Sequence, residues 1–199
     1  MTTLVTGFDP FGESKLNASE LVVTALAALN EPGLVTAILP TSYRRAEERI
    51  DELLRAHRPH LVLMLGLSGK ATNICLEQVA LNLNDSDAPD NDGEIRIRKR
   101  IHEDGPVGYW SSLPLEAMAA DARRLGEEIV FSRDAGSFVC NHLFFTAAHL
   151  VATKHPNCRC GFVHLPPLES PGERLERFVE IVRYWIANHG AASSNRSGE

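Results

Sequence analysis

Short apolar runs alternate along the chain with segments in which apolar residues recur every three or four positions. The first pattern is typical of buried strands and the second of amphipathic helices. The runs predict strands at residues 4–6, 35–39, 61–65, 129–131 and 160–165, and the periodic segments predict helices at residues 17–29, 43–57, 115–128, 141–154 and 172–188. Strands that alternate with helices through short connections indicate an α/β fold, a three-layer α/β/α sandwich with a largely parallel, twisted central sheet.

Several local signals refine this outline. Asn17 is placed to cap the first helix. The face of this helix that we expect to be buried carries Leu21, Val22, Ala25 and Leu29. The aliphatic run at 61–65 is the best candidate for the sheet centre, and the polar, Gly- and Pro-rich residues 83–112 predict an irregular loop with a hairpin. We expect one domain over residues 1–190 and a disordered tail at 191–199.

Charge and composition exclude several classes of partner. The formal net charge is −6 and the 20 basic residues are spread along the chain, so no nucleic-acid surface is predicted. Residues 96–100 form one basic cluster, but acidic residues on both sides of it favour a solvated strand or hairpin face. No apolar run approaches the roughly 18 residues of a membrane span, and we expect no membrane partner. The chain enters a strand almost at once, with no signal-peptide pattern, so we expect a cytoplasmic location and four reduced cysteines.

Candidate chemistry begins with Cys140, which a glycine turn delivers to the start of an apolar helix. Unpaired backbone N–H groups make a helix start electropositive, and such a site together with a cationic neighbour can lower a thiol pKa from about 8.5 to roughly 3.5–7.5. Cys140 is then a nucleophile. The alternative is a small buried residue that packs the helix onto a sheet.

Two further residues can complete a nucleophilic site. His164 lies near the carboxyl end of the strand predicted at 160–165, where open α/β sheets bind their ligands. There it can take the thiol proton and return it to a leaving amine. Glu77 follows two apolar residues and is either a solvated edge residue or a carboxylate that orients an imidazole.

Other motifs do not indicate a metal or a cofactor. Cys158 and Cys160 are separated by one residue, which is too close for the usual zinc-ligand spacing, and no second pair follows. His142 and His149 share a helix face without the glutamate of a zinc-protease motif, and a structural or solvent-facing role is favoured for both. The chain also lacks the glycine-rich loops that bind nucleotides. We therefore expect chemistry that needs neither metal nor cofactor.

Four sequence blocks stand out along the chain: Val-Thr-Gly-Phe-Asp-Pro-Phe-Gly at 5–12, Leu-Glu-Gln-Val-Ala-Leu-Asn at 76–82, Ala-Gly-Ser-Phe-Val-Cys-Asn at 135–141 and Phe-Val-His-Leu-Pro at 162–166. A Pro-Asp-Asn loop motif lies at 89–91. With these blocks in this order, the chain resembles the pyroglutamyl peptidase I (pyrrolidone carboxyl peptidase) family of cysteine peptidases. The resemblance implies that Glu77, Cys140 and His164 form a catalytic triad.

The resemblance also implies a substrate and a pocket. Family members release an N-terminal pyroglutamyl residue from peptides through a thioester acyl-enzyme, and commonly assemble as dimers or tetramers. The ring-packing phenylalanines of the family match Phe8 and Phe11, and Val139, beside the nucleophile, is a third candidate for the pocket wall. Without the resemblance, Phe8 and Phe11 read as ordinary loop-packing aromatics.

Two positions depart from the pattern of many bacterial members. Leu67 stands where those members have a glutamine of the lactam pocket, and Asp87 stands where they have an arginine near the oxyanion site. Two alternatives to the peptidase therefore stay open. One is a related cysteine amidase or thioesterase with altered acyl specificity, and the other is a non-catalytic binding protein on the same fold.

Overall fold

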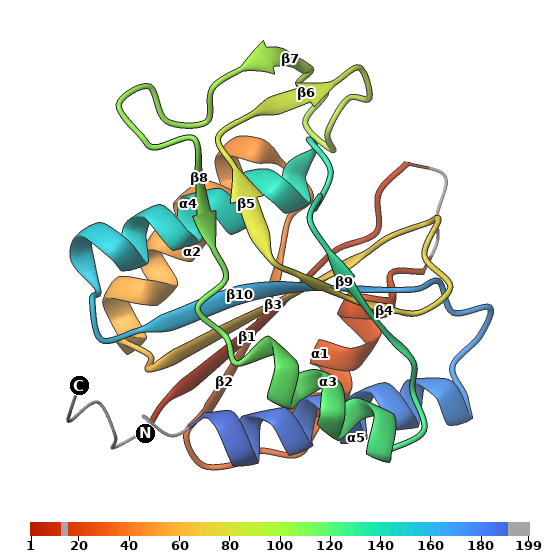
Figure 1. The fold of residues 1–199 in the computed structure, drawn as a ribbon. Coiled ribbons are helices and arrows are strands. Elements are labelled where there is room, and N and C mark those ends of the chain that lie inside the picture. Colours follow the sequence, from red (N-terminus) through yellow and green to blue (C-terminus); the bar gives the residue numbers. More distant parts are fainter. Residues whose placement is uncertain (13–15, 191–199) are drawn as a thin grey trace.

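A six-stranded sheet forms the centre of the molecule in the computed structural model, which describes residues 1–12 and 16–190 (Figure 1). Across the sheet lie β2 (Leu34–Leu39), β1 (Thr3–Phe8), β3 (Leu61–Leu67), β10 (Arg159–Leu165), β4 (Ile74–Glu77) and β9 (Ile129–Ser132). The first four strands are parallel to one another, and β4 and β9, which are parallel to each other, run the opposite way because β4 pairs with β10 antiparallel. The predicted strand at 61–65 does lie in the interior of the sheet, as β3.

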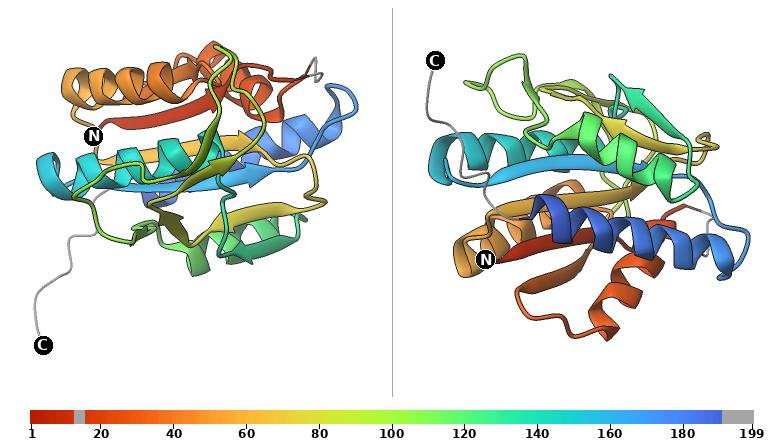
Figure 2. Two further views of the ribbon diagram at one scale, coloured as in Figure 1. Left: turned by 90° about the horizontal axis from the view of Figure 1, so that it is seen from above. Right: turned by 60° about the horizontal axis from the view of Figure 1, so that its bottom comes forward.

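Helices cover both faces of this sheet. In Figure 1, α2 (Tyr43–His57) and α4 (Val139–Lys154) lie above the sheet, while α1 (Ala18–Ala28), α3 (Leu115–Arg124) and α5 (Glu173–His189) lie below it. Figure 2 turns the lower layer toward the viewer, so that α5 crosses in front of the strands. The predicted α/β/α sandwich with a largely parallel sheet is confirmed.

Two apolar clusters hold the three layers together. The cluster under α2 and α4 takes Leu4, Val62 and Phe162 from the strands, and the cluster over α1, α3 and α5 takes Val5, Leu63 and Val163. Successive strand residues point to opposite faces, so a central strand that is buried on both sides is largely apolar. This is why five of the strands could be predicted from apolar runs, whereas β4, in which apolar and polar residues are mixed, was not predicted as a strand.

The segment between β4 and α3 rises above the sheet as two small ribbons. β5 (Val79–Leu81) pairs antiparallel with β8 (Gly108–Trp110), and β6 (Asn84–Ser86) pairs antiparallel with β7 (Arg96–Lys99). The basic cluster therefore lies largely on an exposed hairpin strand, as the flanking acidic residues indicated (Figure 1). Within the described residues, no helix combines the length and the apolar character that a bilayer span requires.

Several predicted details need correction or can be refined. Asn17 does cap α1, where its Oδ1 accepts the Ser19 backbone N–H at 3.0 Å. The buried face of α1 is not the predicted one, because it carries Ala18, Ser19, Val22, Val23 and Leu26. The reason is a contact with β1, in which the Ser19 hydroxyl accepts the Phe8 N–H. Gly7 permits this close approach because it has no Cβ; a Cβ on Gly7 would lie only 2.6 Å from the Ser19 carbonyl oxygen.

The other boundaries change by a few residues. α3 ends at Arg124 rather than at residue 128, because the chain turns at Gly126, whose φ is +84°. α4 begins two residues earlier than predicted, at Val139. The predicted tail at 191–199 lies outside the described residues.

Candidate active site

His164 and Glu77 meet on the face of the sheet that α2 and α4 cover. His164 is the penultimate residue of β10, and Glu77 is the last residue of β4. In the antiparallel register Glu77 lies opposite Phe162, two residues before His164, so both side chains project from the same face. Glu77 Oε1 lies 2.7 Å from His164 Nδ1. The carboxylate is buried and not a solvated edge residue, since Glu77 is only 2% exposed.

Cys140 reaches the same place from α4. It is the second residue of that helix, after a turn in which Gly136 adopts a φ of +77° and Phe138 has extended backbone angles. The half-buried Cys140 side chain lies close enough to His164 to raise the pKa of the imidazole. Because His164 Nδ1 faces Glu77, the other ring nitrogen, Nε2, is the one left for the sulfur. The three predicted residues thus lie together, with a hydrogen bond between His164 and Glu77, although they come from three separate elements.

Electrostatics at this site favour a charged histidine. Burial by itself lowers the pKa of His164, because a buried cation loses its hydration. Interactions with the Cys140 sulfur and the Glu77 carboxylate outweigh burial and raise the pKa of His164 to about 10. An imidazolium at neutral pH can stabilise a thiolate on one side and the Glu77 carboxylate on the other.

Gly66 makes room for the Cys140 sulfur, and this role was not predicted from the sequence. It lies on β3 directly opposite His164 in the parallel register. A Cβ at this position would lie 3.1 Å from Cys140 Sγ and 2.7 Å from Cζ of Phe162. Real Cβ atoms rarely come so close to other atoms, so the sulfur and the ring occupy the space that a side chain would need. The signal in the sequence, a glycine inside an aliphatic strand, indicates such a close approach only after the neighbours are known.

Asn141 fastens the first turn of α4 to the chain that follows Glu77. Its side-chain amide donates to the Leu81 and Leu83 carbonyls, and its Oδ1 accepts the Leu81 N–H, each at 2.9 Å. Asn141 is 1% exposed, so these bonds are shielded from water. One side chain therefore links the helix that carries Cys140 with β5, which directly follows the strand that carries Glu77.

Aromatic side chains flank the start of α4. Phe11 and Phe138 are half-buried with ring centroids 6.0 Å apart, and Phe138 meets the edge of Tyr43 at 5.6 Å. Of the three predicted pocket residues, only Phe11 has substantial exposed surface, because Phe8 is 2% and Val139 0% exposed in the upper core. A direct contact of Phe8 and Val139 with a ligand stays a prediction. Phe138 and Tyr43 were not among the predicted site residues.

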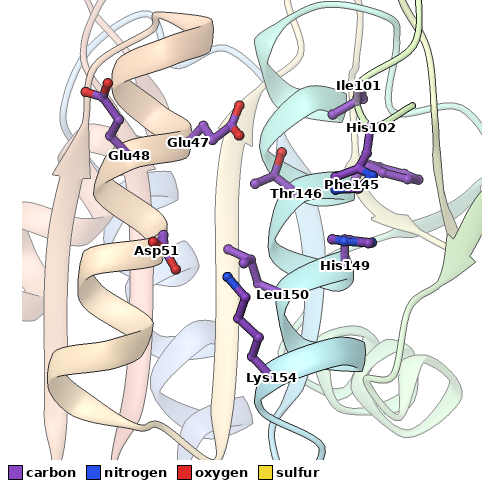
Figure 3. Close-up of a pocket in the computed structure, with 10 residues that line it drawn as sticks. All are labelled: Glu47, Glu48, Asp51, Ile101, His102, Phe145, Thr146, His149, Leu150 and Lys154. Carbon is purple, nitrogen blue, oxygen red and sulfur yellow. The ribbon is translucent and has the colours of Figure 1, made fainter. Parts of the chain in front are cut away.

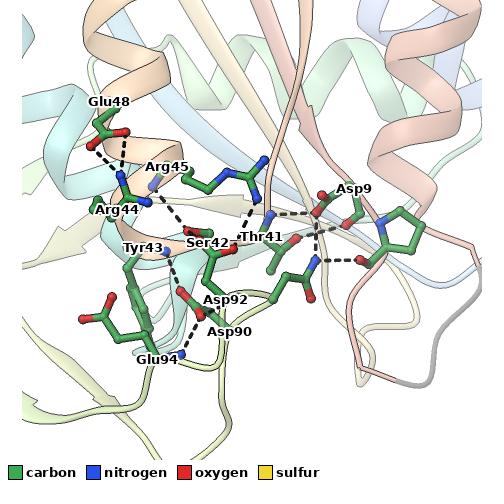
Figure 4. A network of polar contacts seen from close by, with 12 residues as sticks. Asp9, Thr41, Ser42, Tyr43, Arg44, Arg45, Glu48, Asp90, Asp92 and Glu94 are labelled. Carbon is green, nitrogen blue, oxygen red and sulfur yellow. Dashed lines mark hydrogen bonds and ion pairs between the residues drawn. The ribbon is translucent and has the colours of Figure 1, made fainter.

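A polar network holds the loop after β1 beside the aromatic side chains of Phe138 and Tyr43 (Figure 4). Asp9 Oδ1 accepts the Thr41 N–H at 2.6 Å and an amide hydrogen of Asn91 at 3.2 Å, and Asn91 also donates to the Pro10 carbonyl. Asp90 accepts the backbone N–H of Tyr43, the first residue of α2. The Pro-Asp-Asn motif thus ties the loop that carries Phe11 to the start of α2.

Of the two positions that depart from many bacterial members, Leu67 lies away from Cys140. Leu67 packs against the lower cluster, on the face of the sheet opposite to Cys140, because strand residues alternate and Gly66 faces the sulfur. Asp87 is exposed and follows β6, where the backbone of Asp85 is hydrogen-bonded to Ser137 in the turn before Cys140.

A separate cavity of about 350 Å³ opens between α2 and α4 (Figure 3). It is lined by Glu47, Glu48, Asp51, Ile101, His102, Phe145, Thr146, His149, Leu150 and Lys154. None of the predicted site residues is in this lining, so the cavity and the cysteine site are different places. Among the described residues, no group of three or more His, Cys, Asp or Glu side chains is arranged to hold a metal ion.

Known proteins share both the sequence and the fold. The family described as pyroglutamyl peptidase matches residues 1–172. The pyrrolidone-carboxylate peptidase of Bacillus cytotoxicus is 39% identical over 167 residues, which cover 83% of this chain and 78% of that protein. A pyrrolidone-carboxylate peptidase of Streptococcus pneumoniae is 40% identical over 167 residues, with the same coverage. The crystal structure of pyroglutamyl peptidase I from Bacillus amyloliquefaciens superposes with a TM-score of 0.89 at 30% identity, covering 96% of this chain and 95% of that one.

Proposed function

Because the chain belongs to the pyroglutamyl peptidase family, we propose that it removes an N-terminal pyroglutamyl residue from peptides with Cys140, His164 and Glu77 as its catalytic residues. The observation that supports the assignment of these residues is the position of His164, which is hydrogen-bonded to Glu77 and lies close enough to Cys140 for the two side chains to interact. A thiol, an imidazole and a carboxylate in this order are the arrangement used for nucleophilic acyl transfer.

The first half of the reaction forms a thioester. The Cys140 thiolate attacks the pyroglutamyl carbonyl carbon, and the carbonyl electron pair moves onto oxygen. As the carbon–nitrogen bond breaks, the His164 imidazolium gives its Nε2 proton to the departing peptide amine. Glu77 remains a carboxylate throughout, where it holds the ring in orientation and balances the imidazolium charge.

The second half releases pyroglutamate. The now neutral His164 takes a proton from water, whose oxygen attacks the thioester carbonyl, and the carbon–sulfur bond breaks to return the thiolate. Both tetrahedral intermediates carry a negative oxygen. No side chain of the described residues caps α4, so the first backbone N–H groups of this helix can donate to that oxygen. One such donor is worth about 2.7–4 kcal/mol in a comparable enzyme.

The substrate fits a neutral site. The lactam is small, flat and uncharged, and the half-buried rings of Phe11 and Phe138 offer aromatic surface near the nucleophile. A free N-terminal ammonium would lose its hydration there without gaining a charged partner. The cytoplasmic location, the homo-oligomeric state, the independence from cofactors and the single domain over residues 1–190 stay predictions.

A fluorogenic pyroglutamyl amide tests the proposal directly. The wild-type protein should release the fluorophore, and Cys140→Ala and Cys140→Ser should not, while their circular dichroism stays that of the wild type. Cys158→Ala is a matched control, because it removes a buried thiol of the upper core and should leave turnover in place. Normal turnover in either Cys140 variant would refute the nucleophilic role.

The acyl specificity can be settled in the same assay. Prolyl and simple amide or ester reporters should react far more slowly than the pyroglutamyl reporter. Comparable rates on all of them would favour a broader amidase or thioesterase. No turnover on any reporter, with four thiols that label slowly and uniformly, would favour a binding protein.

A further inference from the structure

Tyr43 is a buried tyrosine whose hydroxyl has no partner. It is the first residue of α2 and is 0% exposed, with its backbone N–H bound to Asp90 Oδ2 at 2.9 Å. Its Oη atom is shielded from solvent and has no hydrogen-bond partner among the described residues. Buried hydroxyls are nearly always hydrogen-bonded, because leaving one unpaired destabilises the fold.

The position of the Tyr43 ring connects this residue with the candidate active site. The Tyr43 ring meets the edges of two α4 side chains, Phe138 at 5.6 Å and His142 at 5.3 Å, which lie two residues before and two residues after Cys140. The charge at Cys140 contributes to raising the pKa of Tyr43, so the phenol and the sulfur lie within electrostatic reach of each other. Phe138 in turn contacts Phe11 on the substrate side.

Other groups fix the ring but leave the hydroxyl free. The Arg96 guanidinium lies 4.6 Å from the ring centroid of Tyr43, and Arg96 Nε is bound to Glu94 Oε1 at 2.7 Å. This cation–π contact occupies the face of the ring and makes no bond with Oη. The phenol is therefore held rigidly, with its polar atom unused.

We propose that the Tyr43 hydroxyl donates a hydrogen bond to the lactam carbonyl oxygen of the bound pyroglutamyl ring. This inference rests on the proposed function and adds a specificity-determining residue to it. Phe11 and Phe138 are half-buried, whereas Phe8 and Val139 lie in the core, so the first two rings are the ones that a lactam can contact directly. The lactam supplies the acceptor that the hydroxyl lacks in the free protein.

The protonation state of the phenol suits a donor. Burial, together with the nearby charges of Asp90, Glu94 and Cys140, outweighs the opposing effect of Arg96 and raises the pKa of Tyr43 to about 12. The hydroxyl therefore keeps its proton at neutral pH. A neutral donor matches a neutral lactam, and it would be left unpaired again by a ring that has no carbonyl group.

Tyr43→Phe tests this role, with Tyr109→Phe as a matched control. Tyr109 loses the same atom, but its hydroxyl is already bonded to His149 Nδ1 at 2.9 Å, in the part of α4 that borders the separate cavity. We would measure the dissociation constant of 2-pyrrolidone by NMR titration, the thermal midpoint, and kcat and KM with the pyroglutamyl reporter. Binding of 2-pyrrolidone is independent of turnover.

The two variants should behave in opposite ways. Tyr43→Phe should raise the dissociation constant of 2-pyrrolidone and the KM of the reporter by roughly three- to tenfold, which corresponds to the free energy of one neutral hydrogen bond. Its thermal midpoint should be no lower than that of the wild type. Tyr109→Phe should lower the thermal midpoint and leave lactam binding unchanged.

Three results would overturn the inference: unchanged 2-pyrrolidone binding in Tyr43→Phe, a fall in kcat alone, or equal losses in both variants. A wild-type protein that does not hydrolyse the reporter would instead contradict the proposed function.

Discussion

Replacing Gly66 by alanine should inactivate the enzyme without unfolding it. The added Cβ would lie 2.7 Å and 2.8 Å from Cζ and Cε1 of Phe162, and 3.1 Å from Cys140 Sγ. Ordinary contacts between carbon atoms are about 3.5–4.0 Å, so the ring must retreat by at least about 0.8 Å and the sulfur by a few tenths of an ångström. The methyl group should therefore displace the Cys140 sulfur from its position beside His164.

The surroundings of Phe162 determine the size of the effect. Its ring is enclosed by Phe8, Phe144 and His164, with centroid distances of 6.4, 5.9 and 4.9 Å. Overpacking of such a site costs about 1–3 kcal/mol of stability. A reacting group misplaced by about 1 Å can lose roughly 10²-fold in rate. We expect a fall in kcat of roughly ten- to a hundredfold, with little change in KM.

Steady-state kinetics and thermal denaturation would measure both effects, with Gly69→Ala as the control. Gly69 follows β3 by two residues, and a Cβ there would have no atom within 4 Å, so this variant should match the wild type. In Gly66→Ala the rate at which iodoacetamide alkylates Cys140 should also show an altered pH profile. A Gly66→Ala enzyme that turns over and alkylates like Gly69→Ala would refute the reasoning.

Combining Gly66→Ala with Phe162→Leu separates the two contacts. The smaller side chain relieves the clash with the ring, so the loss of stability in the double variant should be less than the sum of the single losses. Additive losses would show that the ring and the added methyl group do not compete for the same space.

Three further predictions concern the charges of the site. Iodoacetamide near pH 7 should alkylate Cys140 first, because burial raises the pKa of both Cys158 and Cys160 to about 12. Peptide mapping by mass spectrometry measures the labelling of each cysteine, and equal labelling of all of them would contradict this prediction. Glu77→Gln should lower kcat by at least roughly tenfold and change KM less, because an amide cannot balance the His164 imidazolium; an unchanged kcat would show that the carboxylate is not needed. The pKa of His164 rises from 6.5 to about 10 on folding, so its stabilising contribution is fully present below about pH 6.5 and is lost as pH rises through about 10. The thermal midpoints of the wild type and of Glu77→Gln should therefore converge between pH 7 and 10. If the difference between the two midpoints grew with pH instead, the raised pKa of His164 would not be what stabilises the wild type.

Local patterns in the chain were sufficient to locate five strands of the central sheet and the helices α1 to α5, but not β4, where apolar and polar residues are mixed. The predicted strands are largely apolar because both faces of the sheet are covered, and this leaves a signal within a few residues of sequence. The helix from Tyr43 to His57 was predicted with its observed bounds because its buried positions repeat with the helical period. The positions of Cys140 at a helix start and of His164 near a strand end were also predicted from adjacent residues and are observed, while their catalytic roles stay predictions.

Contacts between distant parts of the chain decided how these pieces meet. Glu77 and His164 are 87 positions apart, and only the antiparallel register of β4 and β10 brings them to one face. A one-residue shift of that register would send Glu77 to the opposite side of the sheet. The face of α1 that is buried likewise depends on a contact with another element, the hydrogen bond between Ser19 and Phe8 of β1.

The space around the nucleophile also depends on such contacts. The clearance at Gly66, the burial of Phe8 and the unpaired hydroxyl of Tyr43 each depend on side chains from other elements. No local pattern specifies them, because a residue's own sequence neighbours fix its secondary structure far more than they fix which distant atoms will surround it.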